Sequence, residues 1–471
     1  MAEGRAATPM TVPLIVACAF FMENFDATVI TTALPSIGQT FGVSAVEAGT
    51  GMTAYFVALA AFIPVSGWAA DRFGVKTVFR LSMALFTLAS VACGLCQSLE
   101  QFIAARIVQG AGGAMLVPVG RLAVLRAVEK AEFVRAMSWV TTPALVGSVI
   151  GPPVGGFLTT YVSWRWVFLL QVPVGLLGII LVTRYFAPDR GRDRRPLDWV
   201  GFLSIGPGIA LLVAALEIAA RGETGAALPL ALLGAGAAVL TVAVLHASRH
   251  PAPLIDPSLL RIDTFARSVG SGNLFIVAAA AVPFLMPLML QVGFGFSAFA
   301  SGLMTFTGAA GALAMKAASP AILRRYGFRT VLVGNGLLVA VATILCALFT
   351  QATPAAAIAA VLLAFGFARS LQFVALNTIA YANVPPERMS AATTFAGMTR
   401  QVGNAAGVAG SALILQALVG PGSATVTASD LSAALFAVGG VAGCSALLFL
   451  RLDPAAGADV SGHGRKPPPK T

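Results

Sequence analysis

Apolar residues recur along the chain in blocks of about 20, and the short segments between these blocks carry most of the charge. A helix of that length spans the hydrocarbon core of a bilayer. We therefore predict an all-α membrane protein with fourteen transmembrane helices. The predicted spans are residues 10–35, 47–70, 77–96, 101–121, 134–160, 164–187, 197–219, 226–246, 265–290, 298–318, 329–350, 355–382, 391–419 and 430–450.

An internal repeat organises these spans. The segment Asp71–Val78 returns in weaker form as Arg324–Val331, and the run that starts at Phe41 returns at Phe294. Both pairs are 253 residues apart. The chain is therefore predicted to contain two copies of one unit.

The same offset matches spans one to six with spans nine to fourteen, and leaves spans seven and eight as an inserted hairpin. Because six is an even number, both copies start on the same side, as parallel repeats do. We predict a six-helix bundle at 1–187, a linker and hairpin at 188–262, a second six-helix bundle at 263–451 and a disordered tail at 452–471.

Composition agrees with a membrane protein. The chain is 58% hydrophobic and 10% charged, whereas soluble domains are about a quarter charged. Its net charge is +11, but all except six of its 30 lysines and arginines fall on one side of the predicted topology. The positive-inside rule places that side, with both termini, in the cytoplasm. The basic charge therefore reflects orientation in an inner membrane rather than nucleic-acid binding.

Cofactor and metal chemistry have little support in the sequence. The five cysteines all lie in apolar runs, and the spacing of Cys93 and Cys96 fits either a redox pair or a close helix contact. We find no zinc-type spacing and no nucleophile with a base in the spans. We therefore expect no metal, no cofactor and no enzymatic activity.

A charged turn joins spans two and three, and its key residues are Gly67, Asp71, Arg72, Gly74 and Lys76. Its charges must stay out of the hydrocarbon, where each would cost several kcal/mol. Gly67 should let two backbones approach closely, and Gly74 suits an unusual φ/ψ. The turn either sets topology only, or forms a conformational latch whose ion pairs break during transport.

Spans one and four carry charged residues within the membrane. Glu23 and Asp26 share one helix face near mid-depth, and Arg106 lies at a similar depth. Because buried carboxylates mark ion paths, we predict that Asp26 carries the coupling proton, with Glu23 as the alternative and Arg106 as partner. Alternatively, the carboxylates have a structural role and Arg106 snorkels to the outer interface.

Span five contains the small and kinking residues Gly147, Gly151, Pro152, Gly155 and Gly156. Glycines at this spacing form a flat face for close helix packing. The proline should kink the helix. The kink is either structural or part of a transport cycle.

The second copy carries polar residues at mid-depth. Arginines inside a membrane are costly unless they face water, a substrate anion or a carboxylate. Together with Glu23, these residues are predicted to line a substrate cavity: Arg369, Gln372, Asn377, Arg400 and Gln401.

These motifs together resemble the major facilitator superfamily, and within it the fourteen-helix drug:proton antiporters, over nearly the whole chain. Gly67–Val78 resembles the cytoplasmic loop signature, although Val75 replaces a usual basic residue. The other matches are Asp26–Pro35 with the helix-one signature, Arg106–Ala114 with the helix-four motif and Gly147–Gly156 with the antiporter motif. The resemblance implies two six-helix bundles related by a pseudo-two-fold axis, a central cavity, and proton transfer at Arg106.

We therefore predict a proton-driven exporter of small amphipathic compounds that works by alternating access. Its expected partners are a small-molecule substrate, protons and the lipid bilayer, and we expect a monomer; the sequence does not address a periplasmic adaptor. A specific exporter of a metabolite or peptide is the first alternative. A non-transporting membrane sensor is the second.

Overall fold

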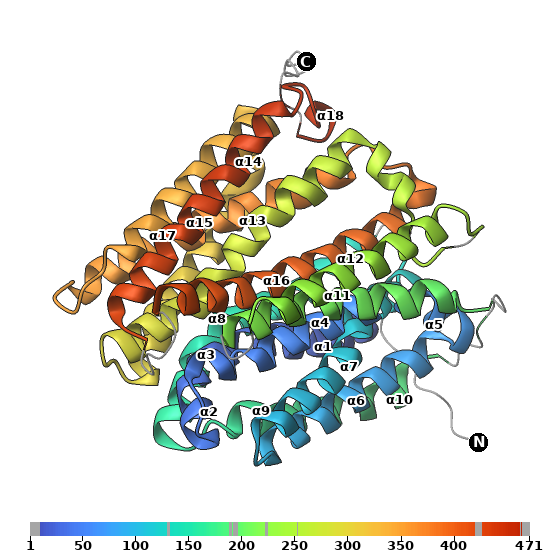
Figure 1. Ribbon diagram of the computed structural model, residues 1–471. Helices are drawn as coiled ribbons and strands as arrows, with labels where there is room; N and C mark the ends of the chain where they lie inside the picture. Colours follow the sequence, from blue (N-terminus) through green and yellow to red (C-terminus); the bar gives the residue numbers. More distant parts are fainter. Residues whose placement is uncertain are drawn as a thin grey trace. The chain divides into compact units, whose positions relative to one another are not determined.

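The computed structural model describes residues 10–129, 132–187, 191, 196–221, 225–251, 253–419, 426–461 and 463. All the regular structure in these residues is helical (Figure 1). Within them, twelve helices are long and apolar enough to cross a membrane. The prediction of an all-α, multi-pass membrane protein is confirmed.

The first repeat and the hairpin contain α1 (Thr11–Val29), α2 (Leu34–Phe41), α3 (Ala45–Ala48), α4 (Thr50–Phe62), α5 (Val65–Phe73), α6 (Val75–Leu95), α7 (Leu99–Ala127), α8 (Phe133–Tyr161), α9 (Trp166–Leu169), α10 (Gln171–Tyr185), α11 (Trp199–Arg221) and α12 (Ala227–Ala247). The rest of the chain contains α13 (Asp263–Leu288), α14 (Ala298–Ala347), α15 (Ala355–Tyr381), α16 (Met389–Val419), α17 (Ala428–Leu448) and α18 (Ala458–Ser461).

These helices form two compact units. The first comprises Met1–Ile255 and Phe296–Leu303, and the second comprises Asp256–Gly295 and Met304–Thr471. The hairpin α11–α12 belongs to the first unit, where it packs on α4. The Thr50 hydroxyl of α4 donates to Glu217 Oε2 of α11 at 2.9 Å, so a polar contact helps to fix the hairpin in place.

The internal repeat is visible in the backbone. Gly42 and its repeat partner Gly295 have φ values of +70° and +74°, while Gly74 and Gly327 have φ values of +85° and +73°. Residues with a Cβ adopt such values only at a cost. Both pairs keep the 253-residue offset, so the backbone turns at matching points in the two predicted copies.

Two helices bear on the number of spans. The 50-residue α14 consists of two helices that meet at a kink at Gly327, and it therefore covers the predicted spans 298–318 and 329–350. The 29-residue α8 occupies the predicted fifth span and continues through Pro143, Pro152 and Pro153, but it is not among the twelve.

The start of the predicted tail is folded. Leu452 is buried, and α18 follows it. A ring nitrogen of His463 lies 3.0 Å from the carbonyl oxygen of Arg324. The prediction of disorder is therefore wrong for residues 452–461, because part of this segment packs against the rest of the second unit. Residues 464–471, and the arginine-rich loop at 190–195 except for Gly191, lie outside the described residues.

Candidate functional site

A buried cluster of polar side chains joins α1, α7 and α10 in the first unit. Asp26 accepts hydrogen bonds from Arg106 Nη1 at 2.7 Å, from Gln109 Nε2 at 3.0 Å and from Gln171 Nε2 at 3.0 Å. The side chains of Asp26 and Arg106 are 0% and 1% exposed. We call these four residues the Asp26 cluster.

Small residues bring the helices close enough to form the cluster. A methyl group at Gly110 of α7 would lie 2.5 Å from the carbonyl oxygen of Tyr55 in α4. One at Gly112 would lie 2.8 Å from the backbone nitrogen of Phe86 in α6. Because α7 can lie so near both neighbours, Arg106 reaches across to α1 instead of extending toward the surface.

Other contacts hold the arginine from its remaining sides. Its guanidinium carbon lies 4.2 Å from the centroid of the Tyr55 ring. Its Nε donates to the carbonyl oxygen of Gly51 at 3.3 Å, and its Nη1 also donates to Gln109. These contacts offset part of the free energy that is lost when a guanidinium leaves water.

The buried ion pair is sensitive to any change in charge. Desolvation costs several kcal/mol per ion, and the mutual attraction of the ions offsets it only with good geometry and additional hydrogen bonds. Removing one charge leaves the other buried and uncompensated, at a cost of about 3–5 kcal/mol. Protonation of Asp26 would remove one charge in just this way. The contact between α1 and α7 at this point therefore depends on the charges of both side chains.

The sequence predicted part of this geometry. The similar depth of Asp26 and Arg106 predicted that they could meet, and they do so in this structure. The alternative in which Arg106 snorkels to the outer interface is wrong, because its side chain is 1% exposed. Glu23 lies almost one turn earlier on α1 and is half-buried.

Two members of the cluster and a neighbour were not predicted from the sequence. Gln109 lies within the helix-four motif but was not among the predicted site residues, and neither was Gln171. Gln109 also donates to the Ser90 hydroxyl of α6 at 2.9 Å. A glutamine inside an apolar span was the available signal, since a buried amide needs hydrogen-bond partners.

The predicted latch has a different partner from the one expected. Asp71 lies at the end of α5, next to the exposed Arg72, but its carboxylate pairs with Arg126 of α7 at 3.3 Å. Lys76 instead donates to the carbonyl oxygens of Thr183 and Phe186 at 2.8 and 2.7 Å. The turn thus links α5 to α7, and the start of α6 to the end of α10.

The glycines of the turn differ in what they do. Gly74 ends α5 with φ +85° and ψ +146°, as predicted for a position that needs an unusual backbone. The predicted close approach at Gly67 is wrong in this structure, because Gly67 is exposed and a methyl group there would meet no described atom within 4 Å.

The glycines of α8 form the close-packing face that the sequence predicted. A methyl group at Gly147 would lie 2.8 Å from the carbonyl oxygen of Phe21 in α1. At Gly151 and Gly155 it would overlap the Thr28 hydroxyl and the carbonyl oxygen of Val29. The face therefore packs on α1, the helix that carries Asp26.

The far end of this face contacts the start of α14, within the same unit. A methyl group at Gly156 would overlap the carbonyl oxygen of Ala298, and one at Gly302 would overlap that of Pro152. In addition, the Phe299 amide donates to the Thr160 hydroxyl at 3.0 Å. Hence α8 is fixed closely along both α1 and the first turns of α14.

The predicted cavity residues of the second unit fall into two groups. Gln372 is buried, donates to the carbonyl oxygen of Leu332 and accepts from Asn335, so it joins helices. Gln401 is also buried and accepts from Asn404. Neither glutamine is among the residues that line the pocket between α13, α15 and α16 described below.

The surroundings of Arg369 differ from those of the two glutamines. Arg369 Nη1 donates to the carbonyl oxygen of Ala279 at 3.4 Å, and its guanidinium lies 5.8 and 5.9 Å from the rings of Phe365 and Phe373. In the described part of the chain, no carboxylate lies within ion-pair distance of Arg369.

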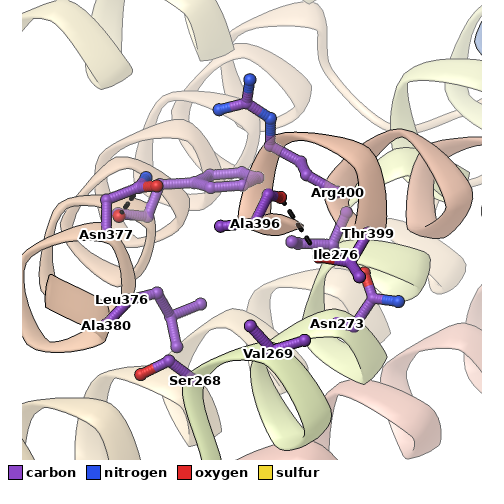
Figure 2. Close-up of a pocket in the computed structure, with 11 residues that line it drawn as sticks. Ser268, Val269, Asn273, Ile276, Leu376, Asn377, Ala380, Ala396, Thr399 and Arg400 are labelled. Atoms are coloured by element: carbon purple, nitrogen blue, oxygen red, sulfur yellow. Dashed lines mark hydrogen bonds between the residues drawn. The ribbon is translucent and has the colours of Figure 1, made fainter. Parts of the chain in front are cut away.

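Arg400 and Asn377 line a pocket between α13, α15 and α16 (Figure 2). Ser268 and Asn273 line the same pocket, and Ser268 Oγ and Asn273 Oδ1 are buried with no hydrogen-bond partner among the described residues. Buried polar atoms are rarely left unpaired. The pocket therefore offers an arginine and several amide or hydroxyl groups to a ligand.

Comparisons with known proteins agree with this fold. Residues 16–408 match the Major Facilitator Superfamily. Relatives from Pectobacterium atrosepticum and Escherichia coli, both named multidrug resistance protein MdtD, are each 35% identical over 405 residues. These alignments cover 85% of this chain and 86% and 85% of the relatives.

Solved structures share the architecture at low sequence identity. A POT family transporter in complex with 5-aminolevulinic acid has a TM-score of 0.71 at 14% identity, over 95% of this chain and 96% of that one. An auto-inhibited POT family peptide transporter has a TM-score of 0.70 at 15% identity, over 97% and 98%. At this identity the likeness concerns the fold alone.

Proposed function

Because the chain belongs to the major facilitator superfamily, we propose that it is a proton-driven exporter of small amphipathic compounds that works by alternating access. The name of its relatives, multidrug resistance protein, supports this substrate class. The observation that carries the proposal is the Asp26 cluster, in which a fully buried carboxylate meets a fully buried arginine.

In the proposed cycle, Asp26 carries the proton. An opposite charge stabilises an ionised carboxylate, whereas burial without that charge stabilises the neutral acid. Separating Arg106 from Asp26 in an outward-facing state would therefore load a proton. Restoring the pair in an inward-facing state would release it to the cytoplasm. Glu23 is the alternative carrier.

The proposed topology has fourteen spans, with both termini in the cytoplasm. Counting α8 and the two parts of α14 together with the other long helices supports this number. The chain would then be an inner-membrane monomer with repeats at 1–187 and 263–451, and with α11–α12 as the inserted hairpin. The positive-inside distribution supports the orientation.

The turn around Asp71 is proposed as the latch of this cycle. The Asp71–Arg126 pair is 52% and 39% exposed, and exposed pairs are worth about 0–1 kcal/mol. A pair this weak can break and re-form within a transport cycle. By contrast, Lys76 has two backbone acceptors at the end of α10, and we propose that it keeps α6 attached to α10 throughout.

A specific exporter of an anionic metabolite or peptide is the second candidate. Two features of the second unit favour it. Arg369 has aromatic rings and a carbonyl group around it in place of a carboxylate, and the pocket beside Arg400 presents the unpaired atoms of Ser268 and Asn273. An anionic group with hydrogen-bond donors would complement both.

Proteoliposomes with an imposed pH gradient test the proposal. Candidate drugs and candidate metabolites are added singly, and collapse of the gradient identifies a transported compound. We expect Asp26→Asn to abolish this response and Glu47→Gln to retain it, because Glu47 belongs to the capping box of α3 and lies outside the Asp26 cluster. If no compound dissipated the gradient with the wild-type protein, the sensor alternative would replace both exporters.

A further inference from the structure

Three potential metal ligands meet where the ends of the inserted hairpin come together. Asp198 immediately precedes α11, His246 lies in the last turn of α12, and His250 follows α12. One ligand atom from each residue lies within 4.8 Å of the others. The two histidine rings have centroids 5.0 Å apart.

The chemistry of this set suits a divalent transition metal. Two imidazoles and one carboxylate are the nitrogen and oxygen ligands that Zn²⁺, Co²⁺ and Ni²⁺ accept. His246 and His250 are four residues apart, a spacing that places two side chains on the same face of a helical turn. Three protein ligands leave one coordination position for water.

We propose that Asp198, His246 and His250 form a Zn²⁺-type site that clips together the two ends of the hairpin. The site lies outside the Asp26 cluster and does not depend on which compound is exported. Under the proposed topology it faces the cytoplasm. No metal was expected from the sequence, because Asp198 and His246 are 48 residues apart and meet only when the hairpin closes.

The carboxylate already has the supporting contacts that metal sites require. Asp198 Oδ1 accepts the Gly201 amide at 2.8 Å, and Oδ2 accepts the Leu254 amide at 3.4 Å. Such outer contacts fix the orientation of a ligand before the metal binds.

A simpler arrangement is a hydrogen-bonded contact between His246 and Asp198 alone. These two residues lie 2.7 Å apart, between His246 Nε2 and Asp198 Oδ1. Ligand atoms around a tetrahedral ion are about 3.3 Å apart, given bond lengths near 2.0–2.1 Å. Insertion of a metal therefore requires only a small opening of this contact and a small approach by His250. The two-residue contact does not need His250, whereas the metal site does.

The metal site and the two-residue contact therefore differ in the effect of removing His250. The full-length protein is purified in detergent through a tag without histidines, stripped with a chelator and titrated with Co²⁺. We expect one Co²⁺ per chain, a ligand-field absorption band of tetrahedral character, and displacement by Zn²⁺. A rise in melting temperature with saturating Zn²⁺ should accompany binding, since a ligand that binds only the folded state stabilises it.

The third histidine provides the control. His250→Ala should weaken Co²⁺ binding by at least about tenfold and remove the thermal shift, and His463→Ala should do neither. His250 lies beyond the end of α12, and the melting temperature of the metal-free variant shows whether its removal leaves the fold intact. Equal Co²⁺ binding by the wild type and His250→Ala, or no absorption band in the wild type, would overturn the proposal.

Discussion

Each unit contains an arginine that contacts one of two positions 253 residues apart in the sequence. The group that the arginine contacts there differs between the two units. In the first unit, Arg106 pairs with Asp26. The residue 253 positions after Asp26 is Ala279, and its carbonyl oxygen accepts from Arg369 in the second unit. One copy therefore holds a charge pair that a proton can disrupt. The second unit holds a cation next to a carbonyl group and two aromatic rings.

The largest expected effect comes from neutralising the carboxylate that only the first unit has. Asp26→Asn cannot lose or gain the coupling proton, so uphill efflux under a pH gradient should fall to the rate of protein-free liposomes. Substrate exchange at equal pH should be partly retained, because it needs no net proton movement. Asp26→Glu should keep some coupled efflux.

The control for this experiment is the second carboxylate of α1. Glu23→Gln should change the range of substrates more than the coupling. If Asp26→Asn still drove uphill efflux and Glu23→Gln did not, the proton carrier would be Glu23, and the contrast between the units would concern structure rather than coupling.

Removing each arginine in turn should lower the free energy of unfolding by different amounts in the two units. Arg106→Gln leaves Asp26 buried without its counter-charge and should lower the free energy of unfolding by about 3–5 kcal/mol. Arg369→Gln removes only a long hydrogen bond and two distant ring contacts, so it should cost about 1 kcal/mol or less. Thermal unfolding in one detergent measures both. A larger loss from Arg369→Gln would indicate a carboxylate partner in another conformation.

The sequence predicted those features that leave a periodic or charged signal. The repeat was readable from Gly42, Gly74 and their partners, because only glycine adopts their φ values easily. The pairing of Asp26 with Arg106 was predicted from their matched depth together with the family resemblance. Gln171 was missed because an uncharged amide hardly interrupts an apolar span.

Partners at helix ends were harder to predict. The pairing of Asp71 with Arg126 depends on how α5 and α7 pack, and nothing local to Asp71 specifies it. The contact of Asp198 with His246 likewise depends on closure of the hairpin. Gly67 was misassigned because glycine occurs both at close contacts and at exposed positions, and sequence alone does not distinguish them.

The next largest effect is expected from disturbing the close packing of α8 on α1. Gly151→Ala places a methyl group against Thr28 of α1, and overpacking of this kind costs about 1–3 kcal/mol. Gly410→Ala in α16 is the matched control, since a methyl group there meets no described atom within 4 Å. We expect a lower melting temperature and slower efflux only for Gly151→Ala. Equal behaviour of the two variants would contradict a specific role for this face.

Substitutions at the proposed latch and at the corresponding position of the second copy should slow efflux to different extents, and this difference should be smaller than the effects above. Asp71→Asn removes an exposed ion pair, so the stability loss should stay below about 1 kcal/mol, while efflux slows because the latch no longer closes. Arg324→Ala, at the corresponding position of the second copy, should slow efflux less. Initial rates in proteoliposomes at equal protein density compare them, and equal slowing would contradict the asymmetry.

The glycines of the two turns provide an internal standard for that comparison. Gly74→Ala and Gly327→Ala both force a Cβ into a backbone region that costs about 1–3 kcal/mol. Their stability losses should therefore be similar, whereas efflux should slow more with Gly74→Ala. If stability and efflux fell together in both variants, the latch would have no role beyond folding.

The smallest expected effect concerns an ion pair of the second unit. Asp256 accepts from Arg388 Nη2 at 2.6 Å and from the Ser258 hydroxyl at 2.6 Å. Burial raises the pKa of Asp256, but the hydrogen bonds from Ser258 and Arg388 outweigh burial, so the pKa lies below its ordinary value. A carboxyl group with a lowered folded-state pKa contributes stability above its unfolded pKa of about 3.9, and that contribution is lost as the pH falls through the folded-state pKa.

Asp256→Asn should therefore lower the melting temperature at pH 7, by an amount equivalent to about 1 kcal/mol or less for a partly exposed pair. The difference from the wild type should shrink as the pH falls below about 4. Asp263→Asn is the control, because its pair with Arg267 lies within one helix and its carboxylate is 60% exposed. The second unit would then have an ion pair that joins its linker to the start of α16, in contrast to the first unit, whose strongest pair lies within the membrane. A difference between Asp256→Asn and the wild type that stayed constant from pH 7 to about pH 3.5 would show that the carboxylate charge does not contribute, and Ser258 would then account for the stability.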